Sequence, residues 1–273
     1  MELFYRKKGT SNLPPLIILH GLWGASDNWL TIAEFLSKRF YVILPDLRNH
    51  GRSPHLPFHN YDALAEDMEE FIETLHLPVR PFLAGHSMGG KTLMRLLIKR
   101  PNIAAKAAIL DICPRSYHTE HTNEHIRLLN FANSVSFSQY QKREAITSLI
   151  RSEFPEEELY QTLLKNLKKT TQGYEWKVNT KIIQKELNSL MDWPFLPSQS
   201  VEYPPTLFIK GEHSDYIQAS DYQLIRQFFP AAQIITLNGV SHRLHTDQPS
   251  LLIATLTDFF LPHECYSQTN RLV

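Results

Sequence analysis

Short apolar runs and longer amphipathic stretches alternate along most of this 273-residue chain. The apolar runs are four or five residues long, are bounded by Gly, Pro, Asp or Asn, and lack the polar alternation of a half-exposed strand. Runs of this kind are typical of strands in a parallel sheet that helices cover on both faces. They predict strands at Leu16–His20, Tyr41–Leu44, Phe82–Gly85, Ala107–Asp111, Thr206–Lys210 and Gln233–Leu237.

The stretches between these runs carry apolar residues at helical spacing. They predict helices at Asn28–Leu36, Asp62–Leu75, Gly90–Lys99 and Pro249–Leu261. The last of these begins with proline, a residue that is favoured in the first helical turn. The alternation of strands and helices predicts an α/β fold with a mostly parallel central sheet flanked by helices.

The alternation stops between Ser116 and Gln199, where the pattern indicates helices without a convincing series of strands. The predicted helices are Glu124–Ala132, Phe137–Ile150, Glu156–Leu167 and Lys181–Met191. A helical insertion inside an α/β sheet usually covers a pocket, although plain scaffold helices are the alternative. We therefore predict a core domain formed by residues 1–115 and 200–273, with residues 116–199 as an inserted helical cap.

Charge and cysteine content exclude several classes of protein. The 28 Lys and Arg residues balance the 28 Asp and Glu residues, so no overall basic field exists to bind nucleic acid or an anionic membrane. The first apolar run is much shorter than the roughly 20 residues of a membrane helix, so we expect no membrane span and no signal peptide. Two cysteines, Cys113 and Cys265, are too few for a disulfide framework, and we expect reduced thiols in a cytoplasmic protein.

The strongest chemical signal is Gly85-His86-Ser87-Met88-Gly89, which matches G-x-S-x-G between a predicted strand and a predicted helix. A nucleophilic serine has to project from a tight strand-to-helix turn, and flanking glycines leave room for that turn. The helix that follows points its first N–H groups at developing negative charge. We predict Ser87 as a nucleophile; the alternative is a glycine-rich turn that binds phosphate or nothing.

A serine hydroxyl is a weak nucleophile at neutral pH and needs a general base. Among 13 histidines, His242 follows the last predicted strand and precedes the last helix, which brings it to the same sheet edge as Ser87. We predict His242 as the base. The acid that orients it is either Asp111 or Asp215, because both follow predicted strands and preserve the chain order serine, acid, histidine.

The oxyanion formed by nucleophilic attack needs two N–H donors about 3 Å away. One is expected from Met88, the residue after the nucleophile, and the other from Leu22 in the loop after the first of the predicted strands. This chemistry needs no metal and no organic cofactor. The segment His121–His125 matches the zinc pattern H-x-x-E-H, but it lies in the predicted cap without an evident third ligand, so we predict no metal site.

These motifs make the sequence resemble the α/β-hydrolase superfamily over nearly its whole length. The segments that carry the resemblance are His20–Gly21, Asp46–Ser53, Gly85–Gly89 and Gly239–His242. More narrowly, the sequence is similar to YbfF-type bacterial esterases and the related mitochondrial abhydrolases. The subgroup features are Arg48–Gly51, Gly85–Lys91, Leu110–Pro114 and Gly173–Asn179.

The resemblance implies an α/β-hydrolase fold in which Ser87 and His242 are catalytic. In that subgroup the usual acid after the next-to-last strand is replaced by the aspartate of the L-D-I-x-P segment, which here is Asp111. The general G-x-x-D pattern would place an acid at position 214, where this chain has Ser214, with Asp215 one residue late. We therefore favour Asp111 and keep Asp215 as the alternative acid.

The resemblance further implies an esterase or thioesterase that acts on small to medium acyl groups through an acyl-serine intermediate. The expected partner is a small-molecule acyl ester or thioester, bound by a monomer or homodimer. Two alternatives remain open. One is a C–C bond hydrolase of diketone-like substrates, which would need a carboxylate site near Arg115 or Arg127. The other is a non-catalytic ligand-binding member of the fold.

Overall fold

The computed structural model describes residues 1–117, 120–140, 142–197 and 201–261. Seven strands form one sheet in the order β1-β3-β2-β4-β5-β8-β9, in which every neighbouring pair is parallel except β1 and β3. The strands are β1 Tyr5–Lys8, β2 Pro15–Leu19, β3 Tyr41–Pro45, β4 Phe82–His86, β5 Lys106–Leu110, β8 Thr206–Gly211 and β9 Gln233–Leu237.

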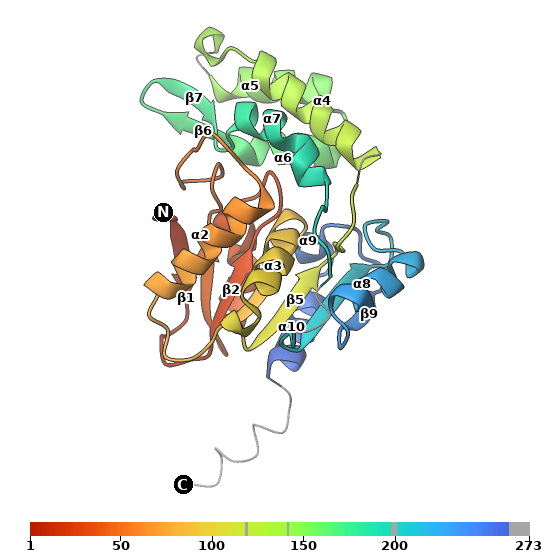
Figure 1. Cartoon of the computed structure of the whole chain (residues 1–273). Coiled ribbons are helices and arrows are strands. Elements are labelled where there is room, and N and C mark those ends of the chain that lie inside the picture. Colours follow the sequence, from red (N-terminus) through yellow and green to blue (C-terminus); the bar gives the residue numbers. More distant parts are fainter. Residues whose placement is uncertain (118–119, 141, 198–200, 262–273) are drawn as a thin grey trace.

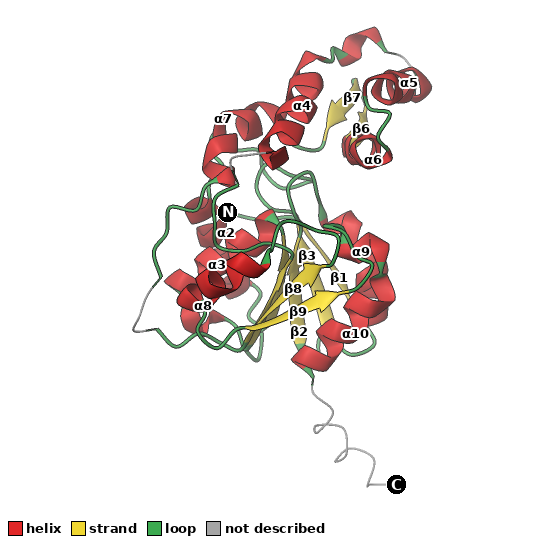
Figure 2. Ribbon diagram, turned by 90° about the vertical axis from the view of Figure 1, so that its right-hand side faces the viewer, coloured by secondary structure: helices red, strands yellow, loops and turns green. Residues whose placement is uncertain are grey.

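Two layers of helices bury the sheet, one on each face (Figure 2). Successive side chains of a strand point to opposite faces, so Leu16 and Ile18 of β2 join one apolar cluster and Ile17 and Leu19 join the other. Helices α1 and α10 pack on the first face, while α2, α3 and α8 pack on the second. Their bounds are α1 Leu30–Leu36, α2 Tyr61–Thr74, α3 Met88–Lys99, α8 Tyr222–Phe228 and α10 Pro249–Phe260.

A third group of elements, residues 120–191, lies beyond one edge of the sheet, and we call it the helical layer (Figure 1). It contains a two-stranded antiparallel hairpin beside its helices. Its elements are α4 Glu120–Ser134, the 3-10 turn Phe137–Gln139, α5 Arg143–Glu153, α6 Glu157–Asn166, β6 Leu167–Thr170, β7 Gly173–Trp176 and α7 Thr180–Met191. The loops that follow the parallel strands face this layer (Figure 1), and side chains from both line one pocket.

The two segments that connect the helical layer to the sheet run side by side. The Tyr117 N–H donates to the Met191 carbonyl at 2.8 Å, and the Ser116 hydroxyl donates to the Asp192 carboxylate at 2.5 Å. The Trp193 N–H in turn donates to the Ser116 hydroxyl at 3.1 Å. The chain therefore leaves the core and returns to it at one place.

The end of α7 is also held by side chains from the core. The last carbonyls of a helix have no partner within the helix and need one from elsewhere. Lys91 of α3 donates to the carbonyls of Met191 at 3.3 Å and Asp192 at 3.0 Å, and the Tyr61 hydroxyl of α2 donates to the Leu190 carbonyl at 2.8 Å. The helical layer is thus tied to the two helices that pack on the central strands.

All six predicted strands are confirmed to within one residue, and the predicted α/β-hydrolase architecture is confirmed with them. The predicted helix Phe137–Ile150 is confirmed only from Arg143 onward, where α5 begins, and its predicted start is wrong because Phe137–Gln139 form a separate 3-10 turn. The Phe137 ring packs edge-on against Trp176 at 5.0 Å, and this contact holds the turn against the hairpin.

The hairpin β6–β7 lies where we predicted no series of strands. Gly173 has φ of 126° at its turn, a conformation that other residues rarely adopt. Strand β1 and helix α8 were also missed, since both are short. Cys265 lies outside the described residues. So does part of the predicted boundary of the segment 116–199.

Candidate active site

Ser87 sits in the tight turn between β4 and α3, with φ of 52° and ψ of −117°. This conformation is strained for a residue with a side chain, and such strain persists only where the surroundings enforce it. The surroundings here are two glycines that admit no larger residue. A Cβ atom at Gly85 would approach the Gly89 carbonyl oxygen to 2.4 Å, and one at Gly89 would approach the His20 carbonyl oxygen to 2.6 Å. This turn, which we call the elbow, therefore depends on these two glycines.

Asp111 lies directly after β5, is fully buried and also has a positive φ, of 50°. Its Oδ2 atom lies 2.8 Å from His242 Nδ1, and its Oδ1 atom accepts the Gly211 N–H at 2.9 Å. The Ser214 hydroxyl donates to the same Oδ2 atom. A buried carboxylate held by three donors has its orientation fixed, so it fixes the orientation of the imidazole beside it.

Asp215 occupies a different environment from Asp111. Its side chain is 60% exposed, and its Oδ1 atom lies 3.3 Å from Nε2 of His121 in α4. It is therefore Asp111, and not Asp215, that the structure brings to His242.

The His242 ring lies flat against Tyr216, with ring centroids 3.7 Å apart and an angle of 14° between the planes. The His86 Nε2–H group donates to the His242 carbonyl oxygen at 2.8 Å. His242 and Ser87 line the same pocket, but no hydrogen bond joins their side chains, both of which belong to the described part of the chain. A looser contact between nucleophile and base is common in the absence of substrate.

The loop after β2 packs directly on the elbow. A Cβ atom at Gly21 would lie 3.2 Å from the Ser87 Cβ atom, and Trp23 in the same loop has φ of 63°. Leu22 of this loop and Met88, the first residue of α3, line a pocket together with Ser87. The first N–H groups of a helix have no acceptor within the helix. The two residues predicted to supply the oxyanion donors are therefore next to the predicted nucleophile.

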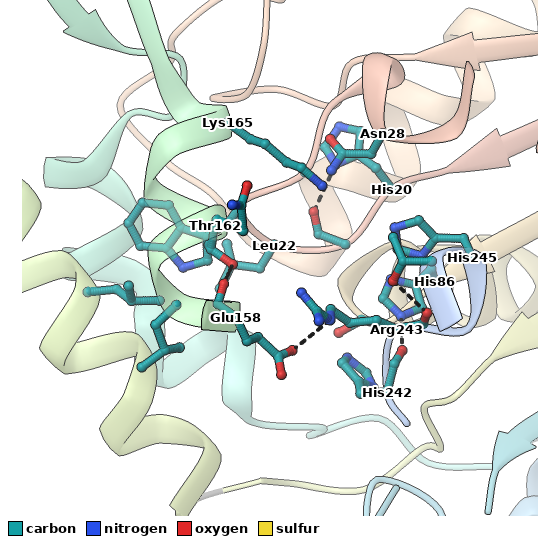
Figure 3. A pocket seen from close by; sticks show the side chains of 18 of the residues that line it. His20, Leu22, Asn28, His86, Glu158, Thr162, Lys165, His242, Arg243 and His245 are labelled. Atoms are coloured by element: carbon teal, nitrogen blue, oxygen red, sulfur yellow. Dashed lines mark hydrogen bonds and ion pairs between the residues drawn. The ribbon is translucent and has the colours of Figure 1, made fainter. Parts of the chain in front are cut away.

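Ser87 lines two adjoining pockets, which we call the larger arm and the smaller arm, and Leu22, His125 and Tyr216 also line both. Figure 3 shows the larger arm. The larger arm encloses about 980 Å³ including its open mouth, and His242 is among its lining residues. The smaller arm encloses about 350 Å³, and Met88 is among its lining residues. Its other lining residues are mostly apolar or aromatic and include Tyr61, Ile112, Tyr117, Leu190 and Met191.

Both the core and the helical layer contribute to the larger arm. Helices α4 and α6 supply polar side chains, and Figure 3 shows Glu158 of α6 reaching Arg243, the residue after His242, at 3.2 Å. The core supplies Asn28 and His245, with the His245 ring stacked on Trp29 at 4.7 Å. The walls of this arm therefore come from segments far apart in the sequence.

Lys91 is a buried lysine that lines the smaller arm. Burial lowers the pKa of its ammonium group to about 7, because desolvation disfavours the charged form. The rings of Tyr117, Tyr61 and Trp193 lie 4.8, 5.5 and 5.9 Å from its Nζ atom. Sequence reasoning noticed Lys91 only as part of the motif, since helical periodicity gives no sign that a lysine points inward.

The segment Asp46–Ser53 acts as a structural loop beneath the site. Asp46 accepts the N–H groups of Ser26 at 2.6 Å and Arg52 at 2.8 Å, while Arg48 forms a buried ion pair with Asp67 at 2.5 Å. His50 of this segment lies between two further buried imidazoles, with ring centroids 5.2 Å from His20 and 5.4 Å from His59. Burial lowers the pKa of each, and that of His59 to about 3.

The two arginines considered in the sequence for a carboxylate site lie outside both arms. Arg115 pairs with Asp221 at 3.3 Å and Arg127 pairs with Glu156 at 2.7 Å, and neither lines either arm. Within the described ranges no group of three or more histidine, cysteine, aspartate or glutamate side chains is placed to hold a metal ion. None of the helices that the structure describes is long and apolar enough to cross a membrane.

Comparison with known proteins shows the family to which this fold belongs. A family model described as the alpha/beta hydrolase fold matches residues 14–249, so the chain belongs to the α/β-hydrolase family. The elbow, the buried aspartate and the histidine loop all fall within the matched range.

Individual relatives indicate which kind of enzyme within this family the chain resembles. The chain is 33% identical over 259 residues to the sn-1-specific diacylglycerol lipase ABHD11 of Danio rerio, covering 93% of this chain and 80% of that protein. It is 30% identical over 245 residues to esterase YbfF of Escherichia coli, covering 90% and 92%. A solved structure described as a marine microorganism esterase superposes with a TM-score of 0.90 at 39% identity, covering 94% and 99%. These relatives are esterases and lipases, so the class of enzyme is a hydrolase.

Proposed function

We propose that this chain is a serine hydrolase that cleaves carboxylic esters or thioesters of small to medium acyl groups through an acyl-serine intermediate. One observation carries the proposal: His242 Nδ1 lies 2.8 Å from the buried Asp111 carboxylate, in a pocket that also contains Ser87. A carboxylate at Nδ1 fixes the tautomer in which Nε2 is free to accept a proton. Asp111 is therefore the acid of the proposed triad, in preference to the exposed Asp215.

The proposed reaction begins when the Ser87 hydroxyl attacks the acyl carbonyl carbon and its proton passes to His242 Nε2. The N–H groups of Leu22 and Met88 stabilise the oxyanion of the tetrahedral intermediate. His242 then gives its proton to the leaving oxygen or sulfur, and the acyl group stays on Ser87. A water molecule, deprotonated by His242, attacks this acyl-enzyme, releases the acid and restores the serine. No step needs a metal or a cofactor.

We propose that residues 116–199 form a cap on a core made of residues 1–115 and 200–273. The support is that α4 and α6 contribute His125, Glu158 and Lys165 to the larger arm, while the nucleophile and base come from loops at the sheet edge. In this arrangement the core supplies the chemistry and the cap supplies much of the substrate pocket.

Hydrolysis of p-nitrophenyl esters, from acetate to octanoate, tests the proposal. Ser87→Ala should lower kcat by at least about 10³-fold, because the covalent step is removed. The matched control is Ser138→Ala, an exposed serine in the helical layer, which should keep full activity. Undiminished hydrolysis by folded Ser87→Ala would refute the acyl-serine mechanism.

The two alternative functions are separated by further measurements. A serine-directed fluorophosphonate should label Ser87, and a folded protein that resists labelling would favour the non-catalytic binding alternative. Cleavage of a diketone substrate at a rate exceeding that of every ester would favour the C–C hydrolase alternative. The pairing of Arg115 and Arg127 away from both arms argues against the carboxylate site that this alternative needs.

A further inference from the structure

The turn that carries the Leu22 N–H group is held by hydrogen bonds that the proposed mechanism does not yet use, and this inference rests on the proposed function. The Gly24 N–H donates to the Gly21 carbonyl at 2.9 Å and closes a four-residue turn, Gly21–Gly24, which we call the oxyanion turn. Trp23 is its third residue and has φ of 63°, although this position of a type II turn usually carries glycine. A tryptophan keeps this conformation only where its surroundings enforce it.

The direction of the Leu22 N–H is set by the Gly21 carbonyl, because both groups belong to one planar trans peptide unit and point in opposite directions. That carbonyl lies 2.8 Å from His20 Nδ1, while His20 Nε2 accepts the Leu47 N–H at 2.9 Å. Since Nε2 is an acceptor, the ring proton is on Nδ1, and His20 donates to the carbonyl. Two donors, the Gly24 N–H and His20 Nδ1–H, therefore hold the peptide unit that supplies the proposed oxyanion donor.

The peptide unit between Trp23 and Gly24 is held from the helical layer. Its N–H is the group that donates to the Gly21 carbonyl, and its own carbonyl accepts the side-chain amide of Asn166 at 2.7 Å. Asn166 is the last residue of α6 and is buried. Its amide nitrogen also donates to the Thr162 carbonyl at 2.9 Å. Both partners are carbonyl oxygens, so the NH2 group of Asn166 is the end of the amide that faces them.

These hydrogen bonds form a series with a single direction. The Asn166 amide donates to the 23–24 peptide unit, which donates to the 21–22 peptide unit, and the N–H of that second unit belongs to Leu22. Hydrogen bonds linked in this way polarise one another where the local dielectric constant is low, so each N–H in the series becomes a stronger donor. The series begins in the helical layer and ends at the proposed oxyanion donor of the core.

We propose that Asn166 is a positioning residue for the oxyanion, which orients and polarises the Leu22 N–H from α6 through the two peptide units of the oxyanion turn. Asn166 is not among the described residues that line either arm, so its effect passes through the turn and not through contact with substrate. Its loss weakens a hydrogen bond that strengthens only as negative charge develops on the carbonyl oxygen. The chemical step should therefore slow while binding of the ester is unchanged.

Two substitutions remove the donor to the turn. Asn166→Leu has a similar volume and no polar atom. Asn166→Ser is shorter, and a serine in a helix commonly donates to the carbonyl four residues back, which here is that of Thr162. Each variant should lower kcat for p-nitrophenyl acetate about five- to fiftyfold and leave KM within about twofold of wild type. This loss is smaller than the roughly 10²- to 10³-fold loss that follows deletion of an oxyanion donor itself.

A trifluoromethyl ketone gives a second readout, because the Ser87 oxygen adds to its carbonyl carbon and leaves an oxyanion like that of the tetrahedral intermediate. Its inhibition constant should rise in both Asn166 variants by the factor by which kcat/KM falls. A helical layer that had merely shifted over the pocket would instead raise KM, and the two factors would differ.

The matched control removes another contact between the helical layer and the core. The backbone N–H of Lys177 donates to the Asn166 backbone carbonyl at 2.8 Å, so this residue lies beside the same end of α6, and its side chain pairs with Asp27 of the core at 2.8 Å. Lys177→Met loses this ion pair and keeps the backbone bond. It should leave kcat and the inhibition constant within about twofold of wild type.

Unchanged kcat in folded Asn166→Leu and Asn166→Ser overturns the inference, as does a rise in KM alone or an equal fall of kcat in Lys177→Met. If neither Asn166 variant folds, the residue serves the fold and not the turn, and the inference fails as well. Failure of the proposed function differs, since it would appear as no fluorophosphonate labelling of Ser87 or full activity in Ser87→Ala. A labelled wild type and an inactive Ser87→Ala beside fully active Asn166 variants would refute the inference alone.

Discussion

The two sides of the pocket are built in different ways. On the core side, Ser87, Asp111 and Trp23 all have positive φ angles in loops that follow parallel strands. On the side of the helical layer, His125 and Glu158 project from regular helices. Backbone strain and a buried hydrogen-bond network fix the first side, whereas the second depends on how the helices are held over the sheet. The core side should therefore tolerate change far less than the layer side.

The largest effect is expected at the buried acid of the core side, and the exposed Asp215 is its comparison. Asp111→Asn should lower kcat on p-nitrophenyl acetate by about 10³- to 10⁴-fold, because the amide stabilises the wrong tautomer of His242 and not its protonated form. Asp215→Asn should change kcat by less than about twofold, as its side chain is 60% exposed and faces His121. Thermal melts would establish that both variants fold. Near-normal turnover in Asp111→Asn with collapse in Asp215→Asn would reverse the assignment of the acid.

Lys91 joins the two sides, and its loss should have an intermediate effect. In Lys91→Met the carbonyls of Met191 and Asp192 lose their donor, which costs about 1–3 kcal/mol for a buried unpaired group and loosens the end of α7. We expect a lower melting temperature and faster hydrogen exchange in α7. Lys99→Met, on the same helix and paired at the surface with Glu66, is the control and should change stability by less than about 1 kcal/mol.

Equal hydrogen exchange of α7 in Lys91→Met and wild type would show that the lysine does not hold this helix. The pH dependence gives a second check. The pKa of Lys91 is lowered from its ordinary value to about 7, so the unfolded chain binds a proton that the folded chain releases between those two values. The Lys91 contribution to the free energy of unfolding is therefore present at high pH and declines as pH falls toward 7. Lys91→Met should remove this pH dependence.

Acid should destabilise the core side through its buried imidazoles. The folded-state pKa of His59 is about 3, against an ordinary value of 6.5, so below pH 6.5 the unfolded state binds a proton that the folded state does not. The His59 contribution to the free energy of unfolding is therefore fully present above pH 6.5. It is lost as pH falls toward 3, by about 1.4 kcal/mol per pH unit for each such proton. Urea unfolding at pH 7.5 and pH 5 measures the slope. His59→Gln should make it shallower, and an unaltered slope would exclude His59 as a contributor.

The smallest effect is expected on the layer side. Glu158 and Arg243 form an ion pair whose side chains are 53% and 35% exposed, so solvent screens it strongly. Glu158→Gln should change the free energy of unfolding by less than about 1 kcal/mol, measured by chemical denaturation. A loss greater than about 2 kcal/mol would mean that the layer side is held as firmly as the core side.

The same contrast explains what the sequence was able to predict. The strands were found because buried parallel strands are continuously apolar, and Ser87 and His242 were found because their motifs encode backbone sterics at strand ends. Asp111 was favoured over Asp215 only with the help of the family resemblance. The residues themselves left the choice open, since both aspartates follow strands.

The layer side was much less predictable. Phe137 was assigned to a helix because its spacing fits one, while its packing on Trp176 decides otherwise. Nothing in local periodicity marks Lys91 or His125 as facing the pocket, because segments that are distant from them in the chain create their environment. The cap boundaries, a cytoplasmic location and a monomeric or homodimeric state stay predictions.

The contact between Ser116 and Asp192 has a consequence for the topology of the chain. Because residues 117–191 depart and return at one point, inserting them adds little loop-closure entropy beyond that of a short turn, and no strand pairing of the sheet depends on them. A chain in which a brief linker joins these two residues keeps the order of all seven strands. Insertions of other sequences at this junction are compatible with the same sheet, so one core is able to carry many different inserted segments.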